Sequence, residues 1–371
     1  MTDLLSMPLH TMPPSPAVTL GPQAYQALPA RLLPLGRQAL LIGGRRALAA
    51  GQQALLDALQ GSGIQLDTAR FAGECTLAQA QALAARARLV GAAAILGMGG
   101  GKAIDTAKLA AQLAGLPVFT LPTIPATCAA LTALSVVHED VTGDSHVSPL
   151  VFLDSPPNQV FLHTGILSQA PLMYLRAGIG DSLAKHVESA FKAGDGPALP
   201  YADQAALSLA RLGYETLLRH GRQALDDAAR GLDSAAFRLV TQCCVVNTGL
   251  VSLWVDERFN GGLAHALFYV LRDVPGFDSL LHGEAVAWGC LVQLAVENKL
   301  DEAGRLRGSL RALGLPVSLR ERGIDLGLVL SRLPQALAQP DLVYTPYPVS
   351  LQSVQDALTL CEAQSLERGT C

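Results

Sequence analysis

A run of glycines between an apolar segment and a helix-like segment constrains this fold more than any other feature. Four of the five residues from Gly97 to Gly101 are glycine, and they follow the apolar run 92–96. A strand–turn–helix of this kind points backbone N–H groups and the positive end of a helix at its guest, which a phosphate or diphosphate suits. Glycine allows the close approach because it has no Cβ. The run lacks the Lys-Ser/Thr pair of a P-loop, since Ala103 follows Lys102, so a purely structural corner stays open.

Two charged residues near the run favour the anion-binding interpretation. Lys102 adds a cation at the turn. Asp105 stands in the first turn of the predicted helix, where it suits the helix dipole and is placed to hold either a ribose hydroxyl or the loop itself.

The first half of the chain alternates strand-like and helix-like segments. Alternation of this kind is typical of a parallel sheet covered by helices, with ligands bound beyond the carboxyl ends of the strands. After about residue 164 the helical patterns dominate. The predicted fold class is therefore α/β: a Rossmann-like parallel-sheet domain over residues 1–160, followed by an all-helical domain over residues 161–371. The strand-like segments are 38–43, 65–71, 92–96 and 117–121, and an extended arm or edge strand is expected in the first thirty residues.

Composition restricts the partners of the chain. Half of the 371 residues are hydrophobic, 16% are charged and the net charge is −4 without a long basic run, so we expect neither nucleic acid nor a membrane as partner. No secretory signal or membrane-spanning apolar run is visible. Seven scattered cysteines without a CxxC pair indicate reduced thiols and a cytoplasmic protein. So apolar a chain favours a homo-oligomer that acts on a small molecule.

One carboxylate and two histidines in the helical half form a candidate metal site. Asp181 follows Ala-Gly-Ile-Gly, His265 follows Gly-Gly-Leu-Ala, and His282 precedes Gly-Glu. An aspartate and two imidazoles suit a divalent metal that keeps an open position. Spacing alone leaves the alternative that Asp181 is a helix cap and that each histidine is a core or capping group.

Taken together, these motifs resemble the iron-activated alcohol dehydrogenase superfamily, most closely its glycerol dehydrogenase branch and a sub-branch of hydroxycarboxylate dehydrogenases. The resemblance extends from about residue 43 to residue 289. The matching segments are Gly99-Gly100-Gly101-Lys102-x-x-Asp105-x-Ala107-Lys108, Leu121-Pro122-Thr123-Ile124-x-Ala126-Thr127, Leu134-Ser135-Val136, Ala177-Gly178-Ile179-Gly180-Asp181, Gly261-Gly262-Leu263-Ala264-His265-Ala266 and His282-Gly283-Glu284.

The resemblance implies a nicotinamide dehydrogenase with its site between a dinucleotide-binding domain and a helical metal-binding domain. It implies that Asp181, His265 and His282 are the metal ligands and catalytic centre, holding one divalent ion, with zinc favoured over iron. The implied cofactor is NAD(P)(H). The residues that the resemblance implies for the diphosphate and ribose are Gly100, Gly101, Lys102 and Asp105, and those for the nicotinamide end are Thr123, Ala126, Thr132 and Leu134, with His138 nearby.

Two departures from the glycerol dehydrogenase pattern bear on the substrate. Cys128 stands where that branch usually carries an aspartate that contacts polyol hydroxyls, and its neutrality makes an anionic substrate less unfavourable. Lys185, four residues after Asp181, replaces a frequent histidine ligand of the iron-type branch. It is placed to pair with Asp181 or with a substrate carboxylate. Arg258 and Arg272 are further candidates for that carboxylate. A buried filler at Cys128 and a solvated helix lysine at 185 stay open.

The end of the first strand bears on the dinucleotide. Gly44 is followed by Arg45 and Arg46, with no acidic residue there to receive the ribose hydroxyls. A guanidinium suits a 2′-phosphate, so we expect NADP(H) to be accepted, although an exposed arginine pair at a helix start is the alternative.

The predicted activity is the interconversion of a small 2-oxo acid and its 2-hydroxy acid by hydride transfer. The alternatives are a glycerol- or diol-type polyol dehydrogenase, a sugar-phosphate cyclase of a related branch, and a non-catalytic protein that kept the fold.

Overall fold

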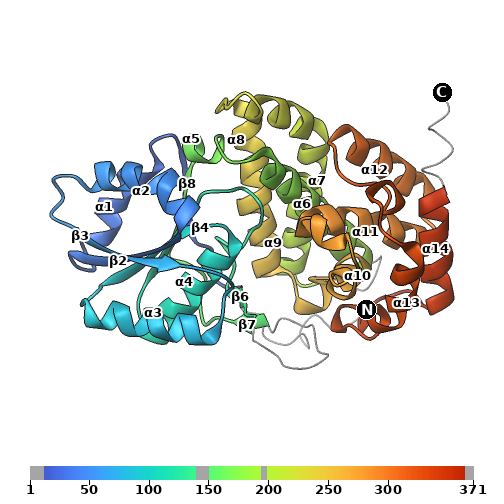
Figure 1. Cartoon of the computed structure of the whole chain (residues 1–371), viewed down its shortest axis with the longest axis horizontal. Helices are drawn as coiled ribbons and strands as arrows, with labels where there is room; N and C mark the ends of the chain where they lie inside the picture. The colour runs from blue at the N-terminus through green and yellow to red at the C-terminus, as the bar shows by residue number, and fades with distance from the viewer. Residues whose placement is uncertain (1–11, 139–149, 194–198, 364–371) are drawn as a thin grey trace.

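A six-stranded parallel sheet organises the N-terminal part of the chain (Figure 1). This computed structural model describes residues 12–138, 150–193 and 199–363. The strands lie in the order β1-β8-β5-β4-β2-β3. Their bounds are β1 Ala17–Gly21, β2 Gln38–Gly44, β3 Gln65–Phe71, β4 Ala94–Gly99, β5 Val118–Pro122 and β8 Gln159–His163. A short antiparallel ribbon of β6 Leu134–Val136 and β7 Leu150–Phe152 lies beside it. The predicted α/β class is confirmed, and β1 is the edge strand expected near the N-terminus.

Helices cover both faces of the sheet, because successive side chains of a strand point to opposite faces. Leu41 of β2 belongs to a cluster with Leu55 of α2, whereas Leu40 and Ile42 belong to another cluster with Leu83 of α3. Each of these side chains is buried. The helices are α1 Leu28–Leu32, α2 Arg45–Leu59, α3 Leu77–Leu89 and α4 Gly101–Ala114.

The strand order reverses between β2 and β4. From β2 the chain continues to β3 on one side, and it then returns to β4 on the other side of β2. In open α/β sheets, ligands bind at such a switch point, beyond the carboxyl ends of the strands. Gly44 ends β2 and Gly99 ends β4, so the glycine run lies at this point of the sheet.

The sequence-based segments agree with the structure except at their ends. The segment 65–71 coincides with β3, while β4 ends at Gly99 rather than at residue 96. The strand continues through the glycines because Gly97 packs directly on α4, where a Cβ would lie 2.7 Å from the Cβ of Ala107. The final strand, β8, ends at His163, and the expected domain division at 160/161 stays a prediction.

The C-terminal half is helical, as predicted, and is built around one buried helix (Figure 1). Residues 283–294 of α11 are buried throughout, including Trp288, and α6, α10, α12 and α14 pack around them. The bounds are α5 Thr164–Leu167, α6 Leu172–Ala193, α7 Tyr201–Ala228, α8 Ala235–Gln242, α9 Thr248–Trp254, α10 Leu263–Leu271, α11 His282–Val296, α12 Leu300–Ala312, α13 Leu326–Leu337 and α14 Leu351–Ala363, with a π-helical turn, Cys243–Asn247, between α8 and α9.

The helical half contains a long apolar helical run. Ala235–Trp254, which joins α8, the π-helical turn and α9, is the one run within the described ranges that is long and apolar enough to cross a membrane. Half of its most apolar window is buried in the protein, and Phe237 and Val251 are fully buried. A core helix shows this burial, so length and composition alone do not assign the run to a membrane.

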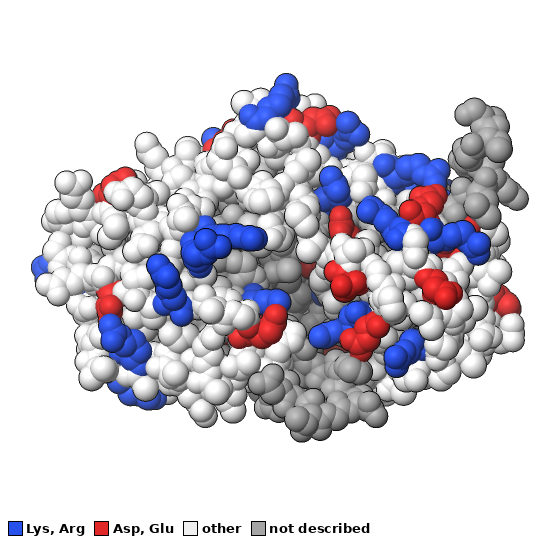
Figure 2. Space-filling model, viewed as in Figure 1, with Lys and Arg blue, Asp and Glu red and all other residues white. Residues whose placement is uncertain are grey.

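Charged side chains do not gather into a basic surface on the face shown in Figure 2. Lysine, arginine, aspartate and glutamate side chains are interspersed there, and the surface is hollowed between the two halves. The two halves also share apolar contacts, since Ile104 and Leu131 of the sheet domain belong to the same cluster as Leu183 and Trp288.

Candidate functional site

Three helices bring the predicted metal ligands together. Asp181 lies on α6, His265 on α10 and His282 on α11, and their ligand atoms all lie within 4.8 Å of one another. The Nε2 atom of His282 is 3.4 Å from Oδ1 of Asp181, and Nε2 of His265 is 3.8 Å from the same oxygen. One carboxylate and two imidazoles, partly buried, are a donor set that divalent zinc or iron accepts with a position left open.

Close helix contacts place these ligands. Asp181 lies inside α6, nine residues after its start at Leu172, so it is not a helix cap. A Cβ on Gly283 would lie 1.9 Å from the backbone oxygen of Ala177, and a Cβ on Gly180 would lie 2.3 Å from the oxygen of Gly283. The glycines next to the ligands in the sequence therefore let α6 and α11 approach each other closely.

Glu188 is part of the site, although the sequence analysis did not identify it. It lies two turns after Asp181 on α6, and only 1% of it is exposed. Its Oε2 lies 2.6 Å from Nδ1 of His265, and its Oε1 accepts a hydrogen bond from the backbone N–H of His265 at 3.0 Å. A carboxylate on the far nitrogen of a metal-binding histidine fixes the orientation and tautomer of the ring.

The ionisation of the cluster follows from these contacts. Burial by itself raises the pKa of Asp181, but the hydrogen bond and charge of His282, then the charge of His265, lower it to about 2. Burial by itself lowers the pKa of His265, but the charge and hydrogen bond of Glu188 outweigh burial and raise it. The carboxylate of Asp181 is thus ionised over the ordinary pH range and available as a ligand.

Cys128 and Lys185 both lie near the metal cluster. Burial, and then the charge of Asp181, raise the pKa of the Cys128 thiol to about 11, while the charge of Lys185 lowers it. Cys128 is therefore a neutral thiol beside the cluster. The Lys185 side chain is 9% exposed and its Nζ donates to Oδ1 of Asn260 at 2.9 Å, so it is not a solvated helix lysine. Of the two other candidates, Arg258 forms an ion pair with Asp256, and Arg272 is the C-cap residue of α10.

The glycine turn has the shape of an anion cradle. Gly99 has φ +154°, which side chains rarely adopt, and a Cβ on Gly100 would lie 2.7 Å from Cδ1 of Ile124. Gly100 is the N-cap residue of α4 and has no side chain to cap the first N–H groups of this helix, which are therefore available to a ligand. These features fit the diphosphate of a dinucleotide.

Lys102 and His138 meet at one carboxylate beside this turn. The ammonium of Lys102 forms an ion pair with Glu74, in the loop after β3, and Nε2 of His138 lies 3.5 Å from the other oxygen of Glu74. Burial lowers the pKa of His138, and the charge of Glu74 opposes that effect. Both side chains are partly exposed at the mouth of the turn.

The remaining predicted cofactor residues are Asp105 and a set that lies at or after the ends of β2 and β5 or near β6. Asp105 is buried and contacts Lys108 and the backbone of Val136, so of its two expected uses the structure shows that of holding the loop. The other predicted residues are Gly44 and Arg45 at the start of α2, Thr123 and Ala126 after β5, Thr132 in the following loop and Leu134 in β6.

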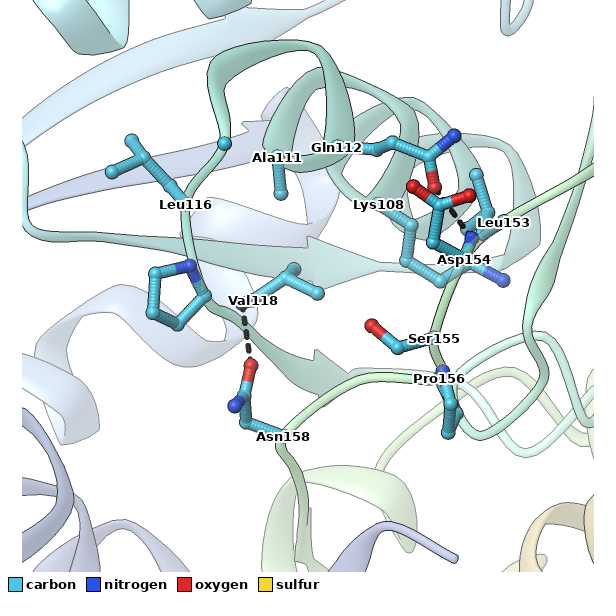
Figure 3. A pocket seen from close by; sticks show the side chains of 12 residues that line it. Lys108, Ala111, Gln112, Leu116, Val118, Leu153, Asp154, Ser155, Pro156 and Asn158 are labelled. Atoms are coloured by element: carbon cyan, nitrogen blue, oxygen red, sulfur yellow. Dashed lines mark hydrogen bonds between the residues drawn. The ribbon is translucent and has the colours of Figure 1, made fainter. Parts of the chain in front are cut away.

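A separate pocket of about 350 Å³ lies at the other end of α4 (Figure 3). Gln112, Val118 and Asn158 line it, and the side-chain oxygen of Asn158 accepts from the backbone N–H of Val118 at 3.0 Å. Because β5 begins at Val118, this pocket lies at the amino ends of the strands, away from the glycine turn. It contains none of the candidate metal ligands.

Comparisons with known proteins converge on one family. The model of the iron-containing alcohol dehydrogenase family matches residues 15–153. A glycerol dehydrogenase of Escherichia coli O6:H1 is 34% identical over 310 residues, which cover 82% of each chain. Hydroxycarboxylate dehydrogenase A of Escherichia coli K12 is 34% identical over 259 residues, covering 69% of this chain and 70% of that protein. The crystal structure of glycerol dehydrogenase from Schizosaccharomyces pombe superimposes with a TM-score of 0.86 at 25% identity, covering 97% of this chain and 92% of that one.

Proposed function

The chain belongs to the iron-containing alcohol dehydrogenase superfamily, in its glycerol dehydrogenase branch, and from that premise we propose that it interconverts a small 2-oxo acid and its 2-hydroxy acid. The family consists of metal-dependent NAD(P) dehydrogenases, so the chain is an oxidoreductase, and the proposal concerns its substrate. The neutral Cys128 thiol and the Lys185 ammonium beside the metal cluster are the observation that carries the choice of substrate.

Asp181, His265 and His282 would hold one divalent ion, for which we propose zinc. When bound, such an ion would supply polarisation of an alcohol or carbonyl oxygen, and a nicotinamide would supply the hydride donor or acceptor. The protein's own part is to place the two reacting centres together. The glycine turn at the switch point would hold the diphosphate, and the residues after β5 would extend from that turn to the metal cluster.

The charges around the cluster favour a carboxylate on the substrate. Asp181 and Glu188 are ionised and buried, and a bound divalent ion would balance them. Lys185 then remains as a buried cation that donates a hydrogen bond to the neutral amide of Asn260. A substrate carboxylate would complete a charge-assisted hydrogen bond with this ammonium, and a neutral thiol at Cys128 would not repel it.

Oxidation of a polyol is the second candidate, and the glycerol dehydrogenase relatives support it equally. The discriminating experiment measures kcat/KM for a panel of 2-oxo acids, 2-hydroxy acids and glycerol with NAD(H) and NADP(H). Strong turnover of glycerol with none of the acids would refute the first candidate. The variant Cys128→Asp sharpens the choice, because a carboxylate at this position should lower kcat/KM for acids and raise it for glycerol.

The metal site has its own test. The variants His265→Ala and Asp181→Asn should lose bound metal and NAD(P)-dependent turnover together, because each removes one of three ligands. His220→Ala, a histidine of α7 outside the cluster, is the matched control and should keep both. Full activity in metal-free wild-type protein would refute the proposed chemistry.

The cofactor and the assembly complete the proposal. Arg45 and Arg46 are exposed at the start of α2, beside the carboxyl end of β2, which is consistent with an NADP(H) 2′-phosphate. The cytoplasmic location and the homo-oligomer stay predictions, and sedimentation velocity of the purified full chain tests the oligomer.

A further inference from the structure

A lysine that the dehydrogenase chemistry does not use lies buried on α4, in the sheet domain. Lys108 of α4 is 1% exposed. Its Nζ donates to the backbone oxygen of Ala129 at 2.8 Å, to that of Thr132 at 3.1 Å and to that of Leu134. It also forms an ion pair with Oδ1 of Asp105 at 3.0 Å. One ammonium therefore binds three carbonyls of the segment from Ala129 to Leu134.

Asp105 continues the same attachment. Its Oδ2 accepts a hydrogen bond from the backbone N–H of Val136 at 3.2 Å, and its own backbone oxygen accepts from Oγ of Ser135 at 2.9 Å. Together, Lys108 and Asp105 bind residues 129–136 at five points along the loop and β6. We call this set of contacts the α4 brace.

The α4 brace resists displacement because Lys108 and Asp105 are buried and pair with each other. A buried ion pair is costly to separate, since each charge would remain without a partner in a medium of low polarity. If the loop shifted away from α4, the ammonium of Lys108 would lose its carbonyl acceptors at the same time. The loop position is thus coupled to the helix that begins at the glycine turn.

This loop adjoins both parts of the proposed site. Ala129 follows Cys128, whose thiol lies close enough to Asp181 and Lys185 for their charges to act on it. On the other side, a Cβ on Gly101 would lie 3.8 Å from the Cβ of Ala129, so the start of the loop packs next to the glycine turn. A dinucleotide that extends from the turn to the metal cluster must therefore pass along this segment.

We propose that Lys108, together with Asp105, is a positioning residue that sets the nicotinamide end of the cofactor site. This inference rests on the proposed dehydrogenase function. The first turn of α4 receives the diphosphate, and the α4 brace, two turns later on the same helix, holds the loop that receives the nicotinamide. One helix thereby fixes the distance between the two ends of the cofactor.

Loss of the α4 brace should weaken NADH binding more than ADP-ribose binding. We call this difference the split, and general destabilisation would not produce it. ADP-ribose contains the adenosine and diphosphate but no nicotinamide, so its affinity should not depend on the loop. NADH also needs the loop. Loss of the brace should therefore weaken NADH binding by about tenfold or more while ADP-ribose affinity changes by no more than about twofold.

The test uses calorimetric titration of the full-length protein with NADH and ADP-ribose, or with NADPH and 2′-phospho-ADP-ribose if the wild type prefers that pair. The variants are Lys108→Met and the double variant Asp105→Asn with Lys108→Met, which leaves no unpaired buried charge. Ser135→Ala, which removes one hydroxyl from the brace, is a milder variant that should show a smaller split. Ala111→Gly, in the same helix but outside the brace, is the matched control and should lower the melting temperature without a split.

The outcomes separate this inference from the proposed function. A wild-type protein that binds neither the dinucleotide nor its fragment would overturn the proposed function, and the inference with it. A wild-type protein that binds both, with variants that bind both equally well or lose both equally, would overturn the α4 brace alone. If the two lysine variants do not fold, Ser135→Ala decides the question, because an unchanged NADH to ADP-ribose ratio there contradicts the inference.

Discussion

Replacing Glu188 by glutamine should weaken metal binding by changing the tautomer of His265. The wild-type carboxylate accepts two hydrogen bonds from His265, one from the backbone N–H and one from Nδ1–H. Glutamine has the same shape but offers one oxygen and one NH₂ group. The backbone N–H can only donate, so it takes the oxygen, and the NH₂ group then faces Nδ1. To accept from it, the ring must carry its proton on Nε2, the nitrogen nearest to Asp181.

The magnitude follows from the competing costs. The variant must either keep the metal-binding tautomer and lose a charge-assisted hydrogen bond, at about 1.5–3 kcal/mol, or adopt a tautomer that cannot bind the ion. Loss of such outer partners typically lowers metal affinity by about 10–100-fold. That range corresponds to about 1.4–2.7 kcal/mol, so the two approaches agree.

The assay titrates zinc into metal-free protein against a chromophoric chelator of known affinity. The control is Glu362→Gln, because Glu362 is also buried and also accepts several donors, among them Nε1 of Trp288 at 3.1 Å and the backbone N–H of Leu319 at 2.9 Å. Glu362→Gln should lower the free energy of unfolding but leave zinc affinity unchanged. The tautomer argument fails if the Glu188 variant binds zinc as tightly as the wild type, or if both variants weaken binding equally.

Three further predictions concern the cofactor, the packing and the pH dependence. Arg45→Ala should lower NADPH affinity by about tenfold and leave NADH affinity unchanged, as measured by fluorescence titration. Gly283→Ala should lower the unfolding free energy by about 3 kcal/mol or more, because the new Cβ would lie 1.9 Å from the oxygen of Ala177. Gly304→Ala places its Cβ in open space and should not lower the unfolding free energy. Urea titration measures both. Burial lowers the pKa of His186 to about 4. The stability that its neutral form contributes above pH 6.5 is therefore lost as the pH falls towards 4. In His186→Phe, urea titrations at about pH 7 and pH 4.5 should show that this part of the acid destabilisation has vanished.

The parallel-sheet part of the fold could be predicted because its signals are local. The apolar run before Gly97 and the helical pattern after Gly101 give a strand, a turn and a helix wherever they occur. The same reasoning misplaced one helix boundary. The Ala- and Leu-rich pattern of residues 226–247 on its own favours one helix, but α7 runs on to Ala228 and α8 starts only at Ala235. Gly231, with φ +66°, and the cap formed by Ser234 on the N–H of Phe237 separate the two helices.

The convergence of the site was not readable from residue spacing. Asp181 and His282 are a hundred residues apart, and their 3.4 Å approach depends on tertiary packing of α6 on α11. Only the resemblance to a family predicted that they lie together, because members of a family share the packing of their helices. The direction of the Asp105 side chain was likewise undetermined, because the first turn of a helix allows it to face either the ligand or the protein.

Glu188 and Lys108 share one structural feature, because each is an ionisable side chain buried within a helix. Residues 103–111 of α4 are all buried, so no face of this stretch is available to a solvated charge. An ionisable side chain there must find a partner of opposite charge or several hydrogen bonds, since burial without them costs more than the helix gains. Lys108 meets that requirement through the loop that leads to the metal cluster, and Glu188 meets it through His265. Each of these two buried charges therefore fixes the position of another segment. Lys108 and Glu188 both contact segments of the proposed active site.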